Sequence, residues 1–519
     1  MNPDLLASLH RECMNFMQVG KYEESLQILE KIRSSGFRHP AFLLDLILCC
    51  HKLRQRDSLL EYITEATLLC EKNGAHLDFL GEELQKMSLY QHALETFRKM
   101  RTCRTDAEKA VGGAREAALH LRLSAIEEAQ EALEYAESFS GSYPEVRSAR
   151  AMWWMRCDPR QALPILTELA QAHSQIPFTF TAAHGHHLAH VQDQLGHYDD
   201  AFVSLCRAKL LEVRHDQKIQ AFQSQRTAWR AWHKDGLQFR REDACKWRNE
   251  CPPSQDHAFL LGHPRSGTTL LEQVLDAHHE LCSIEETNLY SLCIDGQLMA
   301  EHTSSPIDIP FSAYVHQIPE SQMAIRRQNY LLHLQREQQQ DPRIKVWLDK
   351  NPGLSVSVPR MAKTMPHSRL IYAQRDPRDV CISSFFQWCD RTPWSSHWLT
   401  LEDTVQQCLF THDIWQQTKP LLEQDWMEVR YEDMIDDLES WGRKTTEFLG
   451  LQWQAQQIDH KQRAAQKVVK SPTHLAVRKD LYSHSVARWK NYEKRLQPFL
   501  NTFRPMLRDR GYESYNAQN

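Results

Sequence analysis

One short stretch, residues 259–275, constrains the fold more than any other part of the chain. It reads Phe-Leu-Leu-Gly-His-Pro-Arg-Ser-Gly-Thr-Thr-Leu-Leu-Glu-Gln-Val-Leu. An apolar run of strand length is followed by a turn with glycine and proline, and then by apolar residues at helical spacing. A buried strand joined to a helix by a tight loop is typical of an α/β fold with a largely parallel sheet.

The loop between this strand and this helix predicts a site for a phosphate or sulfate ester. The first turn of a helix leaves backbone N–H groups without helical partners, and the helix dipole favours negative charge there. Thr268 and Thr269 add hydroxyl donors, and Arg265 adds a planar cation. The loop departs from the ATP-binding pattern GxxxxGK(S/T), because Thr268 follows Gly267 where the lysine would stand. An ordinary nucleoside triphosphatase is therefore disfavoured.

Further strand-like runs follow, separated by helical patterns. The predicted strands are 258–262, 281–284, 344–348, 370–373 and 427–430. This alternation predicts an α/β domain with a mostly parallel sheet, in which ligands bind at the carboxyl ends of the strands. The polar residues found after those ends are Glu285, Glu286, Asp349, Lys350, Arg375, Ser383 and Tyr431.

Residues 1–240 have a different pattern, with amphipathic helices and almost no strand signal. A small residue, a tyrosine and a second small residue recur with the same spacing at 20–25, 88–93 and 196–201. The first two phrases lie 68 positions apart, which is twice the roughly 34-residue period of tetratricopeptide repeats. The pattern resembles those repeats, although Arg56 replaces the tyrosine in the second unit.

Helix pairs of this kind are expected to stack into a solenoid, because one pair cannot bury its apolar face alone. We expect about five or six imperfect repeats, and an irregular helical bundle is the alternative. Solenoids offer a concave surface, so the predicted partner of this half is a peptide or a protein.

Composition excludes several classes of function. The net charge is −5 and the isoelectric point is about 6.6, so a nucleic-acid partner is not expected. No stretch approaches the roughly 20 apolar residues of a membrane span, and the first residues lack the apolar core of a signal peptide. The 14 cysteines have no zinc-like spacing, which indicates reduced thiols. We therefore expect a cytoplasmic protein.

The second half of the chain resembles the sulfotransferase family, and within it the protein-tyrosine sulfotransferase branch most closely. The segments that carry this resemblance are 264–270, 275–279, 285–287, 350–352 and 375–383. The first resembles the family's 5′-phosphosulfate loop and the last resembles its 3′-phosphate motif. The expected organisation is a tetratricopeptide-like solenoid over 1–214, a helical connector over 215–255, and a P-loop-like α/β sulfotransferase domain over 256–519.

The resemblance implies transfer of a sulfuryl group from 3′-phosphoadenosine-5′-phosphosulfate to an acceptor hydroxyl, without a metal ion. It favours a protein or peptide tyrosine recruited by the repeats. A carbohydrate or small hydroxyl acceptor is one alternative, and a nucleotide-binding scaffold without catalysis is another. In such a transfer the protein contributes mainly positioning and charge stabilisation.

The resemblance also implies roles for individual residues. The implied catalytic residues are Glu286, Lys350 and Arg265, and the implied cofactor-binding residues are Arg265, Ser266, Gly267, Thr268, Thr269, Arg375, Ser383, Tyr431 and Lys479. Glu286 takes the proton of the acceptor, and Lys350 stabilises the departing phosphate oxygen. Arg375 and Ser383 bind the 3′-phosphate, where a guanidinium can bind in bidentate fashion.

Rival interpretations stay open for several of these residues. Glu285 is the rival of Glu286 as base, and Ser384 is the rival of Ser383. Lys350 is alternatively a solvated lysine at the end of a strand.

Other polar and aromatic residues have structural alternatives. Tyr431 is alternatively a buried structural tyrosine, and Lys479 is alternatively part of a basic exposed loop without a ligand. Asp376 and Asp379 are expected to cap or brace the following helix rather than touch a ligand. The tryptophan-rich loop 388–400 is either a lid on the acceptor side or a packing surface against the solenoid.

Overall fold

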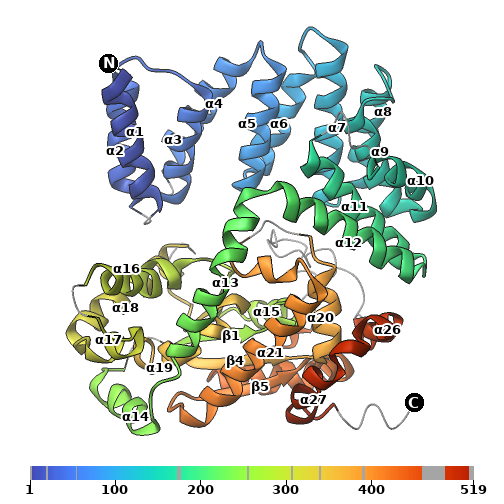
Figure 1. Ribbon diagram of the computed structural model, residues 1–519. Coiled ribbons are helices and arrows are strands. Elements are labelled where there is room, and N and C mark those ends of the chain that lie inside the picture. The colour runs from blue at the N-terminus through green and yellow to red at the C-terminus, as the bar shows by residue number, and fades with distance from the viewer. Residues whose placement is uncertain are drawn as a thin grey trace. The chain divides into compact units, whose positions relative to one another are not determined.

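The chain forms two compact units, which divide between Ala208 and Lys209. The computed structural model describes residues 3–18, 21–53, 55–171, 177–253, 256–305, 308–337, 341–388, 392–458 and 485–512 (Figure 1). Each unit has its own apolar core. The domain limits expected at 214 and 255 stay predictions.

The described part of the first unit consists of helices that pack against their neighbours in sequence (Figure 1). They are α1 (Pro3–Gln18), α2 (Tyr22–Ser34), α3 (Pro40–Leu53), α4 (Arg56–Cys70), α5 (Gly74–Lys86), α6 (Tyr90–Met100), α7 (Asp106–Arg122), α8 (Ile126–Glu137), α9 (Pro144–Cys157), α10 (Pro159–Leu169), α11 (Phe178–Gln194) and the first part of α12 (Tyr198–His215), which continues past the division at Ala208.

Small residues allow the helices of a pair to approach closely. Ser25 of α2 is buried and donates a hydrogen bond of 3.0 Å to the backbone carbonyl of Cys13 in α1. Ala93 of α6 is fully buried. A Cβ atom at Gly81 of α5 would lie only 2.3 Å from the ring of Phe97 in α6. The predicted tetratricopeptide-like helical architecture is confirmed.

The second unit is built around a five-stranded parallel sheet with the order β2-β3-β1-β4-β5. Its strands are β1 (His257–Gly262), β2 (Leu281–Glu285), β3 (Val346–Lys350), β4 (Arg369–Gln374) and β5 (Trp426–Arg430). This confirms the predicted α/β fold class. The third strand begins two residues later than expected, because Ile344 still belongs to a turn in which its N–H donates to Asp341 O at 3.1 Å. Lys350 is therefore the last residue of β3 and does not follow it.

Helices cover both faces of this sheet. The helices of the unit are α13 (Gln217–Asp235), α14 (Arg241–Glu250), α15 (Thr268–Asp276), α16 (Gly296–Ser304), α17 (Phe311–Gln317), α18 (Glu320–Glu337), α19 (Val358–Thr364), α20 (Pro377–Phe385), α21 (Leu401–Thr418), α22 (Tyr431–Asp436), α23 (Leu438–Phe448), α26 (Glu493–Leu496) and α27 (Leu500–Asp509). A π-helical turn, η1 (Ser291–Asp295), and short 3₁₀ turns join them; the latter are η2 (Pro352–Ser357), η3 (Ser395–Trp398), η4 (Lys419–Leu421), η5 (Ala455–Gln457), η7 (Arg488–Tyr492) and η8 (Gln497–Phe499).

Alternate residues of the central strand face two different cores. Phe259 packs in one core with Tyr330 of α18, and Leu260 packs in the other with Leu271 of α15. Because both faces are covered, all six residues of β1 are buried. None of the helices in the described ranges is long and apolar enough to cross a membrane.

Candidate functional site

The loop between β1 and α15 is fixed at both ends. Ser355 accepts a hydrogen bond of 2.8 Å from the N–H of Gly262 and donates one of 2.7 Å to its carbonyl. Gly267 has a φ of 93°, and a Cβ atom there would lie 2.3 Å from the ring of Tyr431, so only glycine fits. No side chain in the described ranges caps α15. The N-terminus of α15, with the positive end of its helix dipole, therefore faces the loop without a capping side chain from the described part of the chain.

Two candidate site residues have unusual backbone conformations. Arg265 has a φ of 76° and Glu286 has a φ of 47°, both in the left-handed region. Positive φ values are uncommon for residues with side chains and gather where the surrounding structure enforces them, often at functional sites. The other non-glycine residues with positive φ in the described ranges are Ser88, Ser124 and Ala487.

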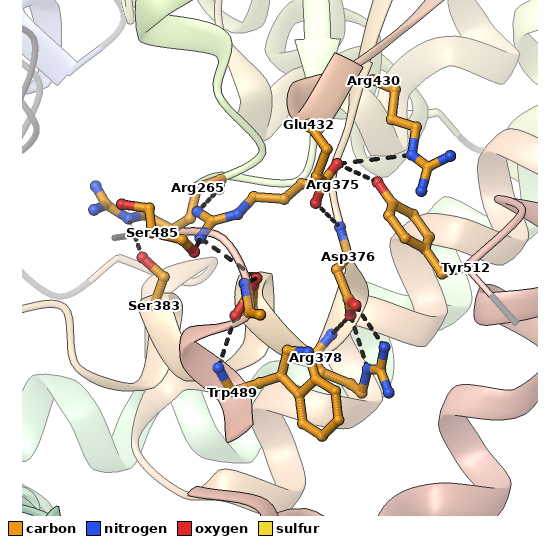
Figure 2. A network of polar contacts seen from close by, with 12 residues as sticks. Arg265, Arg375, Asp376, Arg378, Ser383, Arg430, Glu432, Ser485, Trp489 and Tyr512 are labelled. Carbon is orange, nitrogen blue, oxygen red and sulfur yellow. Dashed lines mark hydrogen bonds and ion pairs between the residues drawn. The ribbon is translucent and has the colours of Figure 1, made fainter. Parts of the chain in front are cut away.

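Arg265 and Arg375 meet at the ends of β1 and β4 (Figure 2). The Nε of Arg265 donates to the Oγ of Ser383 at 3.0 Å, and one nitrogen of Arg375 donates to the carbonyl of Arg265 at 3.1 Å. A second nitrogen of Arg375 donates to the carbonyl of Ser485. The same guanidinium lies 4.9 Å from the ring centre of Tyr431, which is 7% exposed. The structure therefore brings the predicted residues at β1, β4 and β5 together.

Ser383 and its rival Ser384 face different surroundings. Ser383 is half-buried and accepts the hydrogen bond of Arg265, whereas Ser384 is fully buried. The Oγ of Ser384 has no hydrogen-bond partner among the described residues. Its position favours Ser383 as the residue that could contact a ligand.

Lys350 lies among three carboxylates at the ends of β2 and β3. Its Nζ is 2.8 Å from Glu286, 3.2 Å from Glu285 and 3.4 Å from Glu272 of α15. Burial alone would lower the pKa of Lys350, but the charges of the three glutamates raise it above its ordinary value. The side chain of Lys350 is fully buried, which excludes the alternative of a solvated lysine.

The two glutamates at the end of β2 differ in their access to solvent. The side chain of Glu286 is 38% exposed, and that of Glu285 is 5% exposed. The N–H of Glu286 donates to the carbonyl of Lys350 at 2.8 Å, which fixes the turn after the strand. Glu286 is therefore the carboxylate that an acceptor can reach.

Asp349, the neighbour of Lys350, points into a buried polar chain. It accepts a hydrogen bond of 2.7 Å from the hydroxyl of Tyr330, which lies 3.1 Å from the Nε2 of His257. Burial raises the pKa of Asp349 to about 7. Within the described residues, no group of three His, Cys, Asp or Glu side chains is placed to hold a metal ion.

The two aspartates after β4 have structural roles. Asp376 caps α20 by accepting a hydrogen bond of 2.9 Å from the N–H of Arg378, as expected from the sequence. Asp379 accepts hydrogen bonds of 2.8 Å from the N–H groups of Ala487 and Trp489. Burial raises the pKa of Asp379 to about 6. Asp379 therefore anchors the segment that begins at residue 485.

A second set of contacts holds the end of the described chain against the same turn (Figure 2). The hydroxyl of Tyr512 donates to Glu432 at 2.6 Å, and the other oxygen of Glu432 accepts the N–H of Asp376 at 3.0 Å. The guanidinium of Arg378 stacks 3.7 Å above the ring of Trp489. A cavity of about 20 Å³ lies between these residues, enough for one water molecule and far too small for a nucleotide.

Of the aromatic residues of the 388–400 loop, Trp394 and Trp398 pack inside the second unit, whereas Trp388 is exposed. Trp394 lies 5.7 Å from Trp229 of α13 and 5.9 Å from His263, measured between ring centres. Trp398 lies 6.5 Å from His263, the residue two positions before Arg265. Residues 389–391 lie outside the described ranges, as does the predicted nucleotide ligand Lys479.

Sequence reasoning missed Glu272 and the contacts of residues 485–512. A signal for Glu272 exists, because a charged residue in a helix that is buried on all sides requires a partner. No local pattern indicates that Asp379 meets Trp489 or that Glu432 meets Tyr512, since these contacts join segments far apart in the sequence.

Comparison with known proteins places these features in context. A protein-family model, the sulfotransferase family, matches residues 258–455. An uncharacterized protein of Aquifex aeolicus is 25% identical over 343 residues, which cover 63% of this chain and 42% of that protein. Protein-tyrosine sulfotransferase 1 of Danio rerio is 25% identical over 218 residues, which cover 39% of this chain and 56% of that enzyme.

The chain thus spans about half the length of these curated relatives. Among solved structures, the sulfotransferase domain from the curacin biosynthetic pathway matches with a TM-score of 0.35 and 17% identity, covering 50% of this chain and 99% of that domain. Over residues 258–455 the chain resembles the sulfotransferase family, and this region is preceded by a unit of tetratricopeptide-like helices.

Proposed function

We propose that this protein is a sulfotransferase that moves a sulfuryl group from 3′-phosphoadenosine-5′-phosphosulfate to an acceptor hydroxyl. One observation carries the proposal: Arg265 with Ser383, and Lys350 with Glu286, gather at the carboxyl edge of the sheet within the residues matched by the family model. Anions bind at this edge in parallel α/β sheets.

Unpartnered polar atoms in the loop region fit an anionic donor. The Oγ of Ser266 and the Nε of Arg375 are buried, and neither has a hydrogen-bond partner within the described residues. Buried polar groups are nearly always hydrogen-bonded, so each such atom calls for an explanation. Phosphate and sulfate oxygens would supply the acceptors that these two donors lack.

The residues divide into two binding groups. Arg265, Ser266, Gly267, Thr268 and Thr269 would hold the phosphosulfate through amides, hydroxyls and one guanidinium. Arg375 and Ser383 would bind the 3′-phosphate, with Tyr431 beside them. Lys479 remains a predicted ligand.

The chemistry requires one proton acceptor and one hydrogen-bond donor. In the transfer, the acceptor oxygen forms the new bond to sulfur, the bond from sulfur to the phosphate oxygen breaks, and that oxygen keeps the electron pair. Glu286 accepts the proton of the acceptor hydroxyl as the bond forms, because a phenol with a pKa near 10 does not ionise beforehand. Lys350 donates a hydrogen bond to the departing oxygen. The proposal invokes no metal ion.

The acceptor that we favour is a tyrosine of a protein or peptide recruited by the helical unit. Two observations support it: the similarity to a protein-tyrosine sulfotransferase and the tetratricopeptide-like helices, an architecture that provides extended binding surfaces. A carbohydrate or a small hydroxyl compound is the second candidate, because the same transfer can operate on any hydroxyl group.

The test is transfer of radiolabelled sulfate from the phosphosulfate donor to tyrosine peptides, carbohydrates and small phenols, with wild type beside Arg265→Ala. We expect label on tyrosine peptides, lost in the variant. Label confined to carbohydrates or phenols would keep the reaction and replace the acceptor. Binding of the desulfated nucleotide without transfer to any acceptor would favour a nucleotide-binding scaffold.

A further inference from the structure

In this structure Lys350 is not free to contact a ligand. Its side chain is fully buried, and its shortest hydrogen bond, 2.8 Å, goes to the Oε1 of Glu286. That oxygen therefore already shares one of its lone pairs with an N–H group of Lys350. The two residues with complementary roles in the proposed transfer hold each other in a resting contact.

The three carboxylates around Lys350 are not equivalent. Glu286 is 38% exposed at the side chain, whereas Glu285 is 5% and Glu272 is 0% exposed. An anionic group arriving from the loop would compete for the N–H now given to Glu286. A buried ammonium that lost all its partners would be strongly disfavoured, but Glu285 and Glu272 remain beneath it.

Glu272 connects the anion loop to this lysine. It lies one turn into α15, the helix whose first residue, Thr268, belongs to the loop. Its Oε1 accepts a hydrogen bond of 2.7 Å from the hydroxyl of Ser283 in β2, and its Oε2 lies 3.4 Å from the Nζ of Lys350. Glu272 thus joins α15, β2 and β3 at one point beneath the site.

We propose that Glu272 is a positioning residue that holds Lys350 in place during the transfer. Lys350 then moves one hydrogen bond from Glu286 to the departing phosphate oxygen. This change releases Glu286 from Lys350 as Glu286 accepts the proton. This inference rests on the proposed function. Donor binding and release of the base then occur together, because one hydrogen bond of the Lys350 Nζ changes its partner. Glu272 and Glu285 hold this nitrogen in position during the change.

The first test needs no turnover. The titration of the Lys350 amine is followed by nitrogen-15 NMR in wild type, Glu272→Gln and Asp276→Asn. Glutamine keeps the shape of Glu272 and removes its charge, so the pKa of Lys350 should fall. Asp276 is the matched control, since it is a buried carboxylate of α15 that accepts the N–H of Ser283 at 2.9 Å. Its variant should titrate as wild type does.

The second test separates positioning from folding. In Glu272→Gln we expect kcat to fall by about 10–100-fold, as for other residues that orient a reacting group, with little change in KM for the donor. The alkaline limb of the kcat profile should move to lower pH. Asp276→Asn should retain the wild-type profile.

Two results would overturn the inference in distinguishable ways. If wild type transfers sulfate and Glu272→Gln matches Asp276→Asn in both the amine titration and the kcat profile, Glu272 has no positioning role. If wild type neither transfers sulfate nor binds the desulfated nucleotide, the proposed function fails and this inference fails with it.

Discussion

At the scale of single residues, a change at Glu286 should affect sulfate transfer but not nucleotide binding. Glu286→Gln is expected to reduce sulfate transfer by about 100-fold or more, because the proton acceptor is lost. Binding of the desulfated nucleotide should be unchanged, because no predicted nucleotide ligand is altered. Initial rates and calorimetric titration of the nucleotide measure the two effects.

Glu285→Gln is the matched control for this change. Glu285 is also a partner of Lys350, at 3.2 Å, but its side chain is only 5% exposed. Its variant should keep most of the transfer rate. Wild-type turnover in Glu286→Gln, or a larger loss in Glu285→Gln, would move the role of base away from Glu286.

Ser383 provides a second prediction at the residue scale. Ser383→Ala should weaken binding of the desulfated nucleotide by about 1 kcal/mol, the net contribution of one hydrogen bond, or somewhat less than tenfold in affinity. The effect should vanish for a nucleotide without the 3′-phosphate. Ser384→Ala, a change at a fully buried neighbour, serves as the control. Equal losses for both nucleotides would argue against a contact between Ser383 and the 3′-phosphate.

At the scale of elements, the turn from β1 into α15 depends on Gly267. Gly267→Ala should cost about 1–2 kcal/mol for the left-handed backbone and a further 1–3 kcal/mol for the collision with Tyr431. Denaturant unfolding and nucleotide binding measure the damage. Gly450→Ala is the control, because Gly450 also has a positive φ but an added Cβ atom there would lie 3.6 Å from its nearest neighbour. This variant should show only the cost of the left-handed backbone. Equal destabilisation by the two variants would remove the argument for close packing against Tyr431.

The buried polar chain of Asp349, Tyr330 and His257 predicts how the free energy of unfolding changes with pH. The folded protein keeps a proton on Asp349 up to about pH 7, whereas an unfolded aspartic acid releases it near pH 4. The folded state then binds more protons, so this contribution to stability falls as the pH rises from about 4 to 7. The slope is at most about 1.4 kcal/mol per pH unit.

Asp349→Asn should remove this slope. The free energy of unfolding of wild type and variant is measured between about pH 5 and pH 8, and their difference isolates Asp349 from the other titrating groups. Tyr330, His257, Lys350 and Glu272 are the polar neighbours whose charges are common to both proteins. Parallel curves for the two proteins would show that Asp349 titrates normally.

The sequence predicted elements better than it predicted contacts. Local periodicity was enough for the helical unit and for the strands of the sheet, and the anion loop was read from its own glycine, serine and threonine residues. The position of Lys350 inside β3 was missed, because a turn at Asp341 delays the strand by two residues. The contacts of Glu272 and Asp379 depend on how distant elements meet, which no local pattern encodes.

At the scale of the whole molecule, ligand binding should appear as stability. The desulfated nucleotide binds only the folded protein in this proposal, so it adds about 2.7 kcal/mol when its concentration is 100 times its Kd. We therefore expect the unfolding midpoint to rise with nucleotide concentration in wild type and much less in Arg265→Ala. Adenosine 5′-monophosphate, which lacks the 3′-phosphate, should give a smaller shift. An equal shift in the variant would show that the nucleotide binds elsewhere.

The sequence separation of the contacts in each unit also affects how fast that unit folds. Helix pairs make contacts between residues close in the sequence, such as Ser25 and Cys13, 12 positions apart. The anion loop instead depends on contacts with residues far away in the sequence. Ser355 lies 93 positions from its partner Gly262, and Ser383 lies 118 positions from its partner Arg265. Folding slows as contacts become less local. During refolding, helical content should therefore return well before the loop can bind an anion. Recovery of nucleotide binding would be the slowest step that is observed.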